Sequence, residues 1–132
     1  MAAGKDQVTP WRSGDAYAYG VKGGTRIYAG TLVALTASGF AVPAGHTDAK
    51  VIVGVSAHHA DNRDGFDDDG HIRVQKDRTW RLAFDAAPTV TDIGKPVYAV
   101  DDDTVSLSDG SGSRLQVGTL DGIENGIGWT KV

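Results

Sequence analysis

The 132-residue sequence contains no cysteine. Without thiols the chain has no disulfide framework and no cysteine ligand for a metal ion, so it can mature in a reducing cytoplasm. Long hydrophobic runs are missing too: no stretch approaches the ~20 apolar residues that a bilayer span needs. Residues 1–10 lack the apolar core of a signal peptide. We therefore expect a soluble protein without a membrane partner.

A large excess of charge is also absent. The chain has 13 basic and 17 acidic residues, which gives a formal net charge of −4. Nucleic acids and anionic membranes are negatively charged and attract basic proteins. We therefore expect no nucleic-acid partner.

Helical periodicity is not found either, because Gly or Pro interrupts every window that could form an amphipathic helix. Glycine is abundant instead, with 18 residues, about twice the average usage of ~7%. Short β-prone runs separated by turn residues at intervals of about 8–12 residues are typical of β-sandwiches and small barrels. The sequence predicts an all-β fold, a compact β-barrel or β-sandwich of roughly nine short strands. Residues 15–132 are expected to form one domain, and residues 1–14 an extended N-terminal arm.

The expected strands show either alternation or a short β-branched run. We expect Val51–Val55 to be buried on both faces. Trp80, Leu82 and Phe84 should lie on one strand and form much of the core, with Lys76–Arg78 as the preceding turn. Residues 58–70 are predicted to be an acidic loop, and residues 86–92 a connection with one helical turn. The other predicted strands comprise Tyr17–Val21, Thr31–Leu35 paired with Phe40–Val42, Ile72–Gln75, Val97–Val100 paired with Thr104–Leu107 across three aspartates, Leu115–Thr119, and Ile127–Lys131 after a turn at 122–126.

The N-terminal segment has two interpretations. Residues 1–14 are polar, with Trp11 as the one large aromatic side chain beside Pro10. The segment is either a frayed terminus or an arm whose Trp11 docks on a neighbouring subunit, because a solvated Trp exposes a large apolar surface. For the second interpretation the candidate contacts are Pro10, Trp11, Arg12, Tyr17 and Tyr19.

Two groups of polar residues are candidates for chemistry. His58, His59 and His71 flank a loop rich in aspartate, a mixture that can bind a metal ion, but the spacing does not fit an EF-hand. Asp101–Asp103 lie in a predicted hairpin turn, where adjacent carboxylates face water in different directions. No phosphate-binding loop or nucleophile elbow is present. We therefore expect no catalytic residues, no cofactor and no metal, and we interpret both groups as solvated turns.

Five segments, in this order, resemble the phage capsid decoration, or cement, proteins. The similarity covers most of residues 27–132 and leaves the N-terminal segment uncovered. The segments are Tyr28–Val33 (YAGTLV), Gly54–Ala57 (GVSA), Asp92–Leu107 (DIGKPVYAVDDDTVSL), Val117–Leu120 (VGTL) and Gly128–Val132 (GWTKV).

This resemblance implies a structural role. Proteins of that family are compact and β-rich, attach to the outer face of an assembled head and clamp neighbouring major capsid protein subunits. They usually do so as trimers, with dimers in some relatives, and often with an N-terminal arm along the shell. The implied protein is a non-enzymatic homo-oligomer, with a trimer favoured and a dimer as the alternative, made in the host cytoplasm and located on the virion's outer capsid surface.

Two other functions remain open. One is a carbohydrate- or receptor-binding β-module, in which Trp and Tyr side chains stack on sugar rings. The other is a small hydrolase that uses His58, His59 or His71 with a metal ion.

Overall fold

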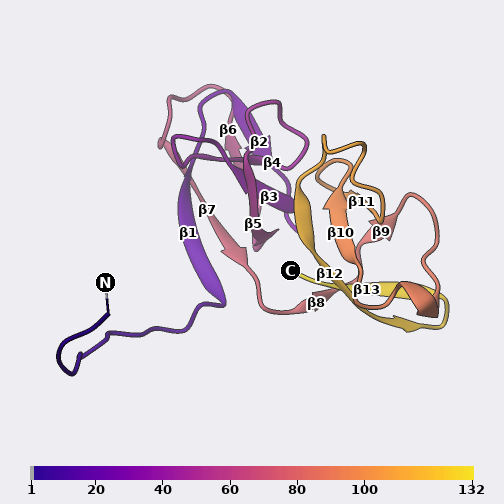
Figure 1. The fold of residues 1–132 in the computed structure, drawn as a ribbon. Coiled ribbons are helices and arrows are strands. Elements are labelled where there is room, and N and C mark those ends of the chain that lie inside the picture. Colours follow the sequence, from indigo (N-terminus) through magenta and orange to yellow (C-terminus); the bar gives the residue numbers. More distant parts are fainter. Residues whose placement is uncertain (1) are drawn as a thin grey trace.

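The computed structural model describes residues 2–132, and nearly all of their regular structure consists of short β-strands (Figure 1). The predicted all-β fold is confirmed. Within this part of the chain the one helical element is the 3₁₀ turn η1, Val90–Asp92, where the sequence predicts a helical turn. No helix among these residues is long and apolar enough to cross a membrane.

The first half of the chain forms a closed five-stranded barrel. Around the barrel the order is β1–β4–β3–β5–β7, and every neighbouring pair is antiparallel except β1 and β4. The hairpin predicted at residues 31–42 is confirmed as the β3–β4 pair. The barrel strands are β1 (Ala16–Val21), β3 (Leu32–Leu35), β4 (Ala41–Pro43), β5 (Val51–Ser56) and β7 (Gly70–Gln75), and a two-stranded sheet adds β2 (Thr25–Ile27) and β6 (Ala60–Asn62).

The second half forms a six-stranded sheet beside the barrel (Figure 1). The predicted hairpin across the three aspartates is confirmed as the β10–β11 pair. A long hairpin joins β12 and β13 through Asn125 and Gly126, which both have positive φ (52° and 75°), as Asn-Gly hairpin turns require. In sheet order the strands are β8 (Thr79–Trp80), β13 (Ile127–Lys131), β12 (Gln116–Glu124), β10 (Pro96–Ala99), β11 (Thr104–Ser106) and β9 (Ala83–Phe84).

Two apolar clusters stabilise these sheets. One fills the barrel and includes Val33, Ile72 and Val74. The other joins the barrel to the second sheet and includes Leu32 and Leu120. Successive side chains of a strand point to opposite faces, so Leu32 and Val33, both 0% exposed, belong to different clusters. The barrel is therefore covered on one outer side by the six-stranded sheet.

The strand predicted through Trp80, Leu82 and Phe84 is wrong. The structure has two separate two-residue strands, β8 paired with β13 and β9 paired with β11, at opposite edges of the six-stranded sheet. β8 ends at Trp80 and β9 begins at Ala83, three residues later. Three Cα–Cα steps of 3.8 Å span about 11 Å at most, so the sheet must curl until these two edge strands lie close together. Trp80, Leu82 and Phe84 are half-buried and pack against the second cluster without being fully enclosed by it.

Other local predictions also need correction. Val51–Val55 is not buried on both faces, because Val51 is 52% exposed and only the second half of β5 is buried. Lys76–Arg78 forms no hairpin turn; it links barrel strand β7 to β8 in the other sheet. The loop predicted at residues 58–70 contains β6, and β12 continues through Gly122 as far as Glu124.

Candidate functional site

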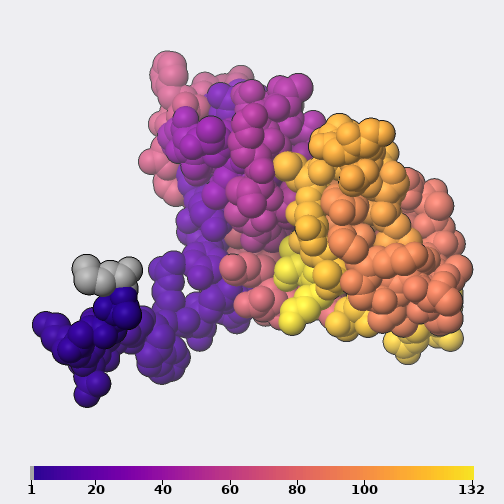
Figure 2. All heavy atoms as spheres, in the orientation of Figure 1, coloured from indigo at the N-terminus to yellow at the C-terminus, as the bar shows by residue number. Residues whose placement is uncertain are grey.

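The N-terminal segment belongs to none of the sheets, and most of it projects away from them. Residues 2–14 contain no strand or helix, and Figures 1 and 2 show the segment in indigo, projecting from the start of β1. Val8 is 99% exposed and Trp11 is 89% exposed, while Pro10 and Arg12 are exposed as well. The segment therefore presents apolar side chains that the rest of the described chain does not cover.

Aromatic and cationic side chains meet where this segment joins β1. Tyr17 and Tyr19 lie two residues apart on one face of β1, and their rings stack with centroids 6.4 Å apart. The Arg12 guanidinium carbon lies 4.7 Å from the centre of the Tyr17 ring, and Lys76 Nζ lies 5.0 Å from it. Such cation–π contacts contribute about 0.5–1 kcal/mol each at exposed sites. We call Arg12, Tyr17, Tyr19 and Lys76 the arm root.

The arm root has a physical basis in strand pairing. Ala16 pairs with Gln75 across β1 and β7, and the Lys76 backbone N–H donates to the Asp15 carbonyl at 3.0 Å. This register places Lys76 beside Tyr17. Burial raises the pKa of the Tyr19 hydroxyl, and the Tyr17 hydroxyl adds to the effect, whereas the charge of Arg12 opposes it. The rings of Tyr17 and Tyr19 are both half-buried at this position.

The residues of the histidine-aspartate loop do not converge. Asp61 forms a two-pronged ion pair with Arg63, with N–O distances of 2.9 and 2.8 Å, and this hydrogen bonding lowers the pKa of Asp61. Asp67 accepts a hydrogen bond from the Gly23 backbone, and Asp69 accepts one from the Phe66 backbone. These carboxylates are therefore engaged in shaping the loop.

The three histidines of that loop are also separate. His58 Nε2 accepts from the Arg73 backbone N–H at 3.1 Å, His59 lies against the Tyr28 ring, and His71 Nε2 lies 3.4 Å from Asp68. Among residues 2–132 these side chains form no group of three or more potential metal ligands. The structure thus does not assemble the site that a metal-dependent hydrolase hypothesis needs.

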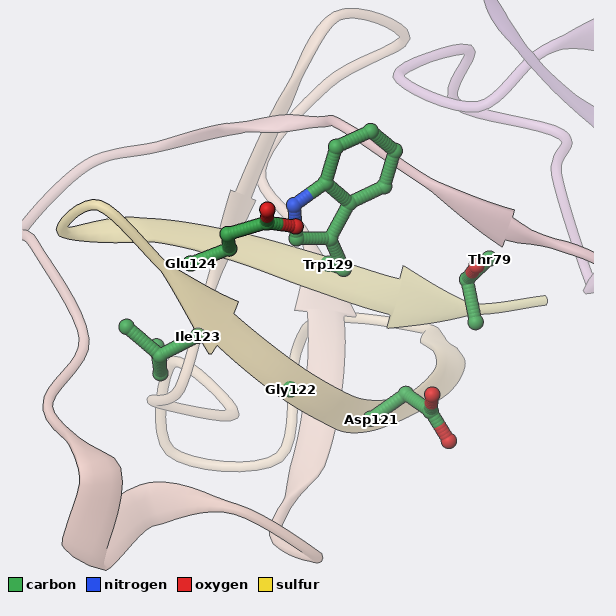
Figure 3. Close-up of a pocket in the computed structure, with 6 residues that line it drawn as sticks. All are labelled: Thr79, Asp121, Gly122, Ile123, Glu124 and Trp129. Atoms are coloured by element: carbon green, nitrogen blue, oxygen red, sulfur yellow. The ribbon is translucent and has the colours of Figure 1, made fainter.

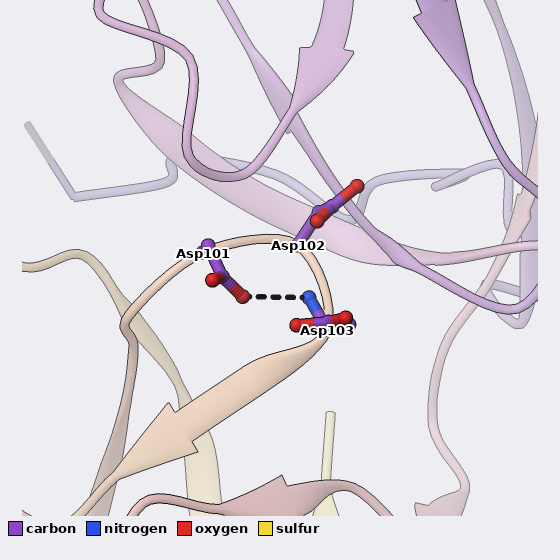
Figure 4. A group of neighbouring side chains, drawn as sticks. All are labelled: Asp101, Asp102 and Asp103. Atoms are coloured by element: carbon purple, nitrogen blue, oxygen red, sulfur yellow. Dashed lines mark hydrogen bonds between the residues drawn. The ribbon is translucent and has the colours of Figure 1, made fainter.

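Asp101, Asp102 and Asp103 do lie together, with one oxygen from each within 4.8 Å of the others. Figure 4 shows the Asp101 carboxylate turned toward the Asp103 backbone N–H, while the Asp102 side chain points to the other side of the turn. Asp101 Oδ1 accepts from the backbone N–H groups of Asp103 at 3.0 Å and Thr104 at 2.8 Å. This is the turn-stabilising pattern of aspartate in a hairpin.

The pKa of Asp101 is lowered in this turn, whereas the pKa of Asp102 is raised. Burial alone would raise the pKa of Asp101, but the hydrogen bonds from Asp103 and Thr104 lower it. Burial raises the pKa of Asp102, and the charges of Asp103 and Asp101 raise it further. Local hydrogen bonds explain the position of Asp101. The prediction that all three carboxylates face water in different directions is wrong for Asp102, which is half-buried.

A shallow depression of about 360 Å³ lies over β12 and β13. Figure 3 shows the Trp129 ring standing out from β13, with Glu124 on one side and Thr79 on the other. The remaining lining residues are Asp121, Gly122 and Ile123. The sequence predicts Trp129 only as part of the strand Ile127–Lys131 and does not indicate this feature.

Two structural features therefore escape local sequence reasoning. Lys76 joins the arm root only through the β1–β7 register, and it is separated from Tyr17 by 58 intervening residues. The depression includes Gly122, which lies at an irregularity in the pairing of β12 with β13. The spacing of the residues involved contains no signal for either feature.

These observations define an all-β protein with a closed barrel, an attached curled sheet and an exposed N-terminal segment rooted in stacked tyrosines. No protein-family model, no curated protein and no solved structure matches the chain.

Proposed function

We propose that this protein is a structural component of a phage head that binds the outer surface of the assembled capsid. In this proposal it contacts neighbouring major capsid protein subunits, acts as a homo-oligomer, most readily a trimer, and carries out no catalysis. The observation that carries the proposal is the uncovered N-terminal segment, in which Val8 and Trp11 are 99% and 89% exposed. Large apolar side chains in a projecting segment are typical of a surface that becomes buried on a partner.

The arm root supports the same interpretation. Arg12, Tyr17 and Lys76 form a half-buried aromatic surface edged by two cations at the base of the segment. Interface centres are enriched in Trp, Tyr and Arg because these side chains combine a large apolar area with directed polar groups. The segment and its root together supply such a centre.

Stabilisation of the capsid would follow from mass action. A protein that binds only the assembled shell lowers the free energy of that shell by RT ln(1 + [L]/Kd). An oligomer engages several capsid subunits at once, and this raises its effective affinity. Strand pairing already fixes the barrel backbone, so the backbone entropy lost on docking would come mainly from residues 2–14, which have no strand or helix.

The experiment is a binding assay on purified phage heads. Expanded heads without their natural decoration are mixed with the purified protein, sedimented and then heated. We expect the protein to co-sediment with the heads and to raise their disruption temperature. If it does not bind expanded heads of the phage that encodes it, the proposal is wrong.

A further inference from the structure

The depression over β12 and β13 has an unfilled floor. The pairing of these strands shifts register between Leu120 and Gly122, which marks a β-bulge. A Cβ atom built on Gly122 would meet nothing within 4 Å, and Gly122 is not among the glycines with positive φ. The backbone therefore does not require glycine here. Glycine within a strand often marks a place where a ligand approaches the backbone closely.

The walls of the depression combine an aromatic surface with hydrogen-bonding groups. Trp129 is half-buried, while Asp121, Glu124 and Thr79 are exposed. Within residues 2–132, neither the Asp121 nor the Glu124 carboxylate forms an ion pair or a side-chain hydrogen bond. Lys131 lies two residues from Trp129 on β13 and therefore on the same face of the strand. Asp121 and Glu124 thus line the depression, while Lys131 is not a lining residue and lies on the neighbouring part of the same strand face.

From this arrangement we infer that the depression binds a neutral sugar ring. A pyranose has an apolar C–H face that packs against an indole, and hydroxyl groups around its edge. Those hydroxyls donate strong charge-assisted hydrogen bonds to carboxylates such as Asp121 and Glu124. The glycine floor lets the ring approach the strand, and Trp129 forms the surface on which it stacks.

The volume of the depression and the charges around it favour a sugar over a protein partner or a cationic ligand. A volume of about 360 Å³ lies at the lower end of small-molecule sites, which span roughly 300–1,000 Å³. A stable protein partner covers about 800 Å² on each side with an apolar centre, whereas Trp129 is bordered here by charged residues. A purely cationic ligand would benefit from the two carboxylates, but Lys131 on the same face opposes it.

This site goes beyond capsid attachment and shares no residue with the arm or its root. Sugar binding is measured on the isolated protein without capsids. Failure of one proposal therefore leaves the other standing.

The test uses the three tryptophans of the chain. Isotope-labelled protein shows one indole N–H signal each for Trp11, Trp80 and Trp129, assigned with single Trp→Phe variants. The protein is screened on a printed array of neutral oligosaccharides, and the tightest binder is titrated into the labelled protein. We expect a saturable shift of the Trp129 signal, with the Trp11 and Trp80 signals unchanged.

Variants sharpen the test. Gly122→Val fills the floor without backbone strain and should weaken sugar binding by about tenfold or more, with the Trp80 signal reporting an intact fold. Glu124→Gln and Asp121→Asn should each weaken it severalfold, while Trp11→Phe should leave it unchanged. Three results would overturn the inference: no neutral sugar on the array binds, binding survives Gly122→Val, or a tri-arginine peptide binds more tightly than every sugar.

Discussion

The backbone N–H of Leu32 donates a hydrogen bond of 2.8 Å to the carbonyl oxygen of Asp102. Leu32 begins barrel strand β3, and Asp102 lies at the centre of the acidic turn between β10 and β11. A Cβ added to Gly45, just after β4, would lie 3.2 Å from the Asp101 Cβ, so this turn packs closely on the barrel. The acidic turn therefore helps to join the two halves of the fold.

The Asp102 side chain makes stability depend on pH. Its pKa is raised in the folded protein by burial, and further by Asp103 and Asp101, so folding favours its protonated form. Such a group opposes folding once pH rises above its folded pKa. Asp102→Asn should therefore raise the melting temperature at pH 7, and the gain should disappear below the ordinary pKa of aspartate. A gain that is the same at pH 3 and pH 7 contradicts this explanation.

Asp101 should behave in the opposite way. Its carboxylate accepts two backbone hydrogen bonds, and these lower its pKa despite burial. Its stabilising contribution is present at neutral pH and is lost as pH falls through the lowered pKa. Asp101→Ala should cost about 1 kcal/mol of unfolding free energy at pH 7 and less at pH 2–3. Denaturant melts at the two pH values measure the difference, and an equal cost at both would rule out the carboxylate as its source.

Thr130 offers a stabilising substitution. It is 0% exposed, and among the described residues its hydroxyl is buried without a hydrogen-bond partner. Replacing the hydroxyl with a methyl group of similar shape removes this desolvation cost, so Thr130→Val should stabilise the fold by about 1 kcal/mol. Thr130→Ser is the control, because it keeps the hydroxyl, loses a buried methyl and should destabilise the protein by a similar amount. Destabilisation by Thr130→Val would indicate that the hydroxyl has a partner.

Gly54 should tolerate no side chain. Its φ is 149°, and a Cβ there would lie 2.5 Å from the Gln75 carbonyl oxygen on neighbouring strand β7. The closed barrel gives that strand no room to move away. Gly54→Ala should cost at least about 2 kcal/mol, from backbone strain and displacement of the β5–β7 pair together. Gly39 is the control, because it also has a positive φ of 87° but has open space around its Cα. Gly39→Ala should lower the unfolding free energy by only about 1 kcal/mol. If Gly54→Ala and Gly39→Ala lower the melting temperature equally, backbone strain alone explains both effects and the contact with Gln75 contributes nothing.

The N-terminal segment should be required for attachment and not for folding. Residues 2–14 contain no strand and no member of either apolar cluster, so removal of residues 1–14 should change the melting temperature little. Trp11→Ala should weaken binding to expanded heads by about 2 kcal/mol, or roughly thirtyfold in Kd, if Trp11 is an interface anchor. Phe66→Ala is the matched control, since Phe66 is also an exposed aromatic, at 83%, in a different loop. Unchanged head affinity of the truncated protein would remove the segment from the proposal.

Much of the local structure could be predicted because its causes are local. Ile72 and Val74 alternate with polar residues, and both side chains are buried on β7. The turn of Asp101–Asp103 follows from short acceptors that bond to their own backbone. The failures lie where distant pairing decides the outcome. Trp80 and Phe84 have the alternation of a single strand, yet β13 pairs with one and β11 with the other.

The sequence by itself determined the all-β class and the two hairpins at residues 31–42 and 97–107, since alternation and turn residues act over a few residues. Only the tertiary structure decided that the barrel closes, that the second sheet curls, that Lys76 meets Tyr17 and that Trp129 borders a depression. Each of these depends on which backbone hydrogen-bonding groups pair across many residues. That choice is made by the packing of the whole chain and leaves no signal in residue spacing.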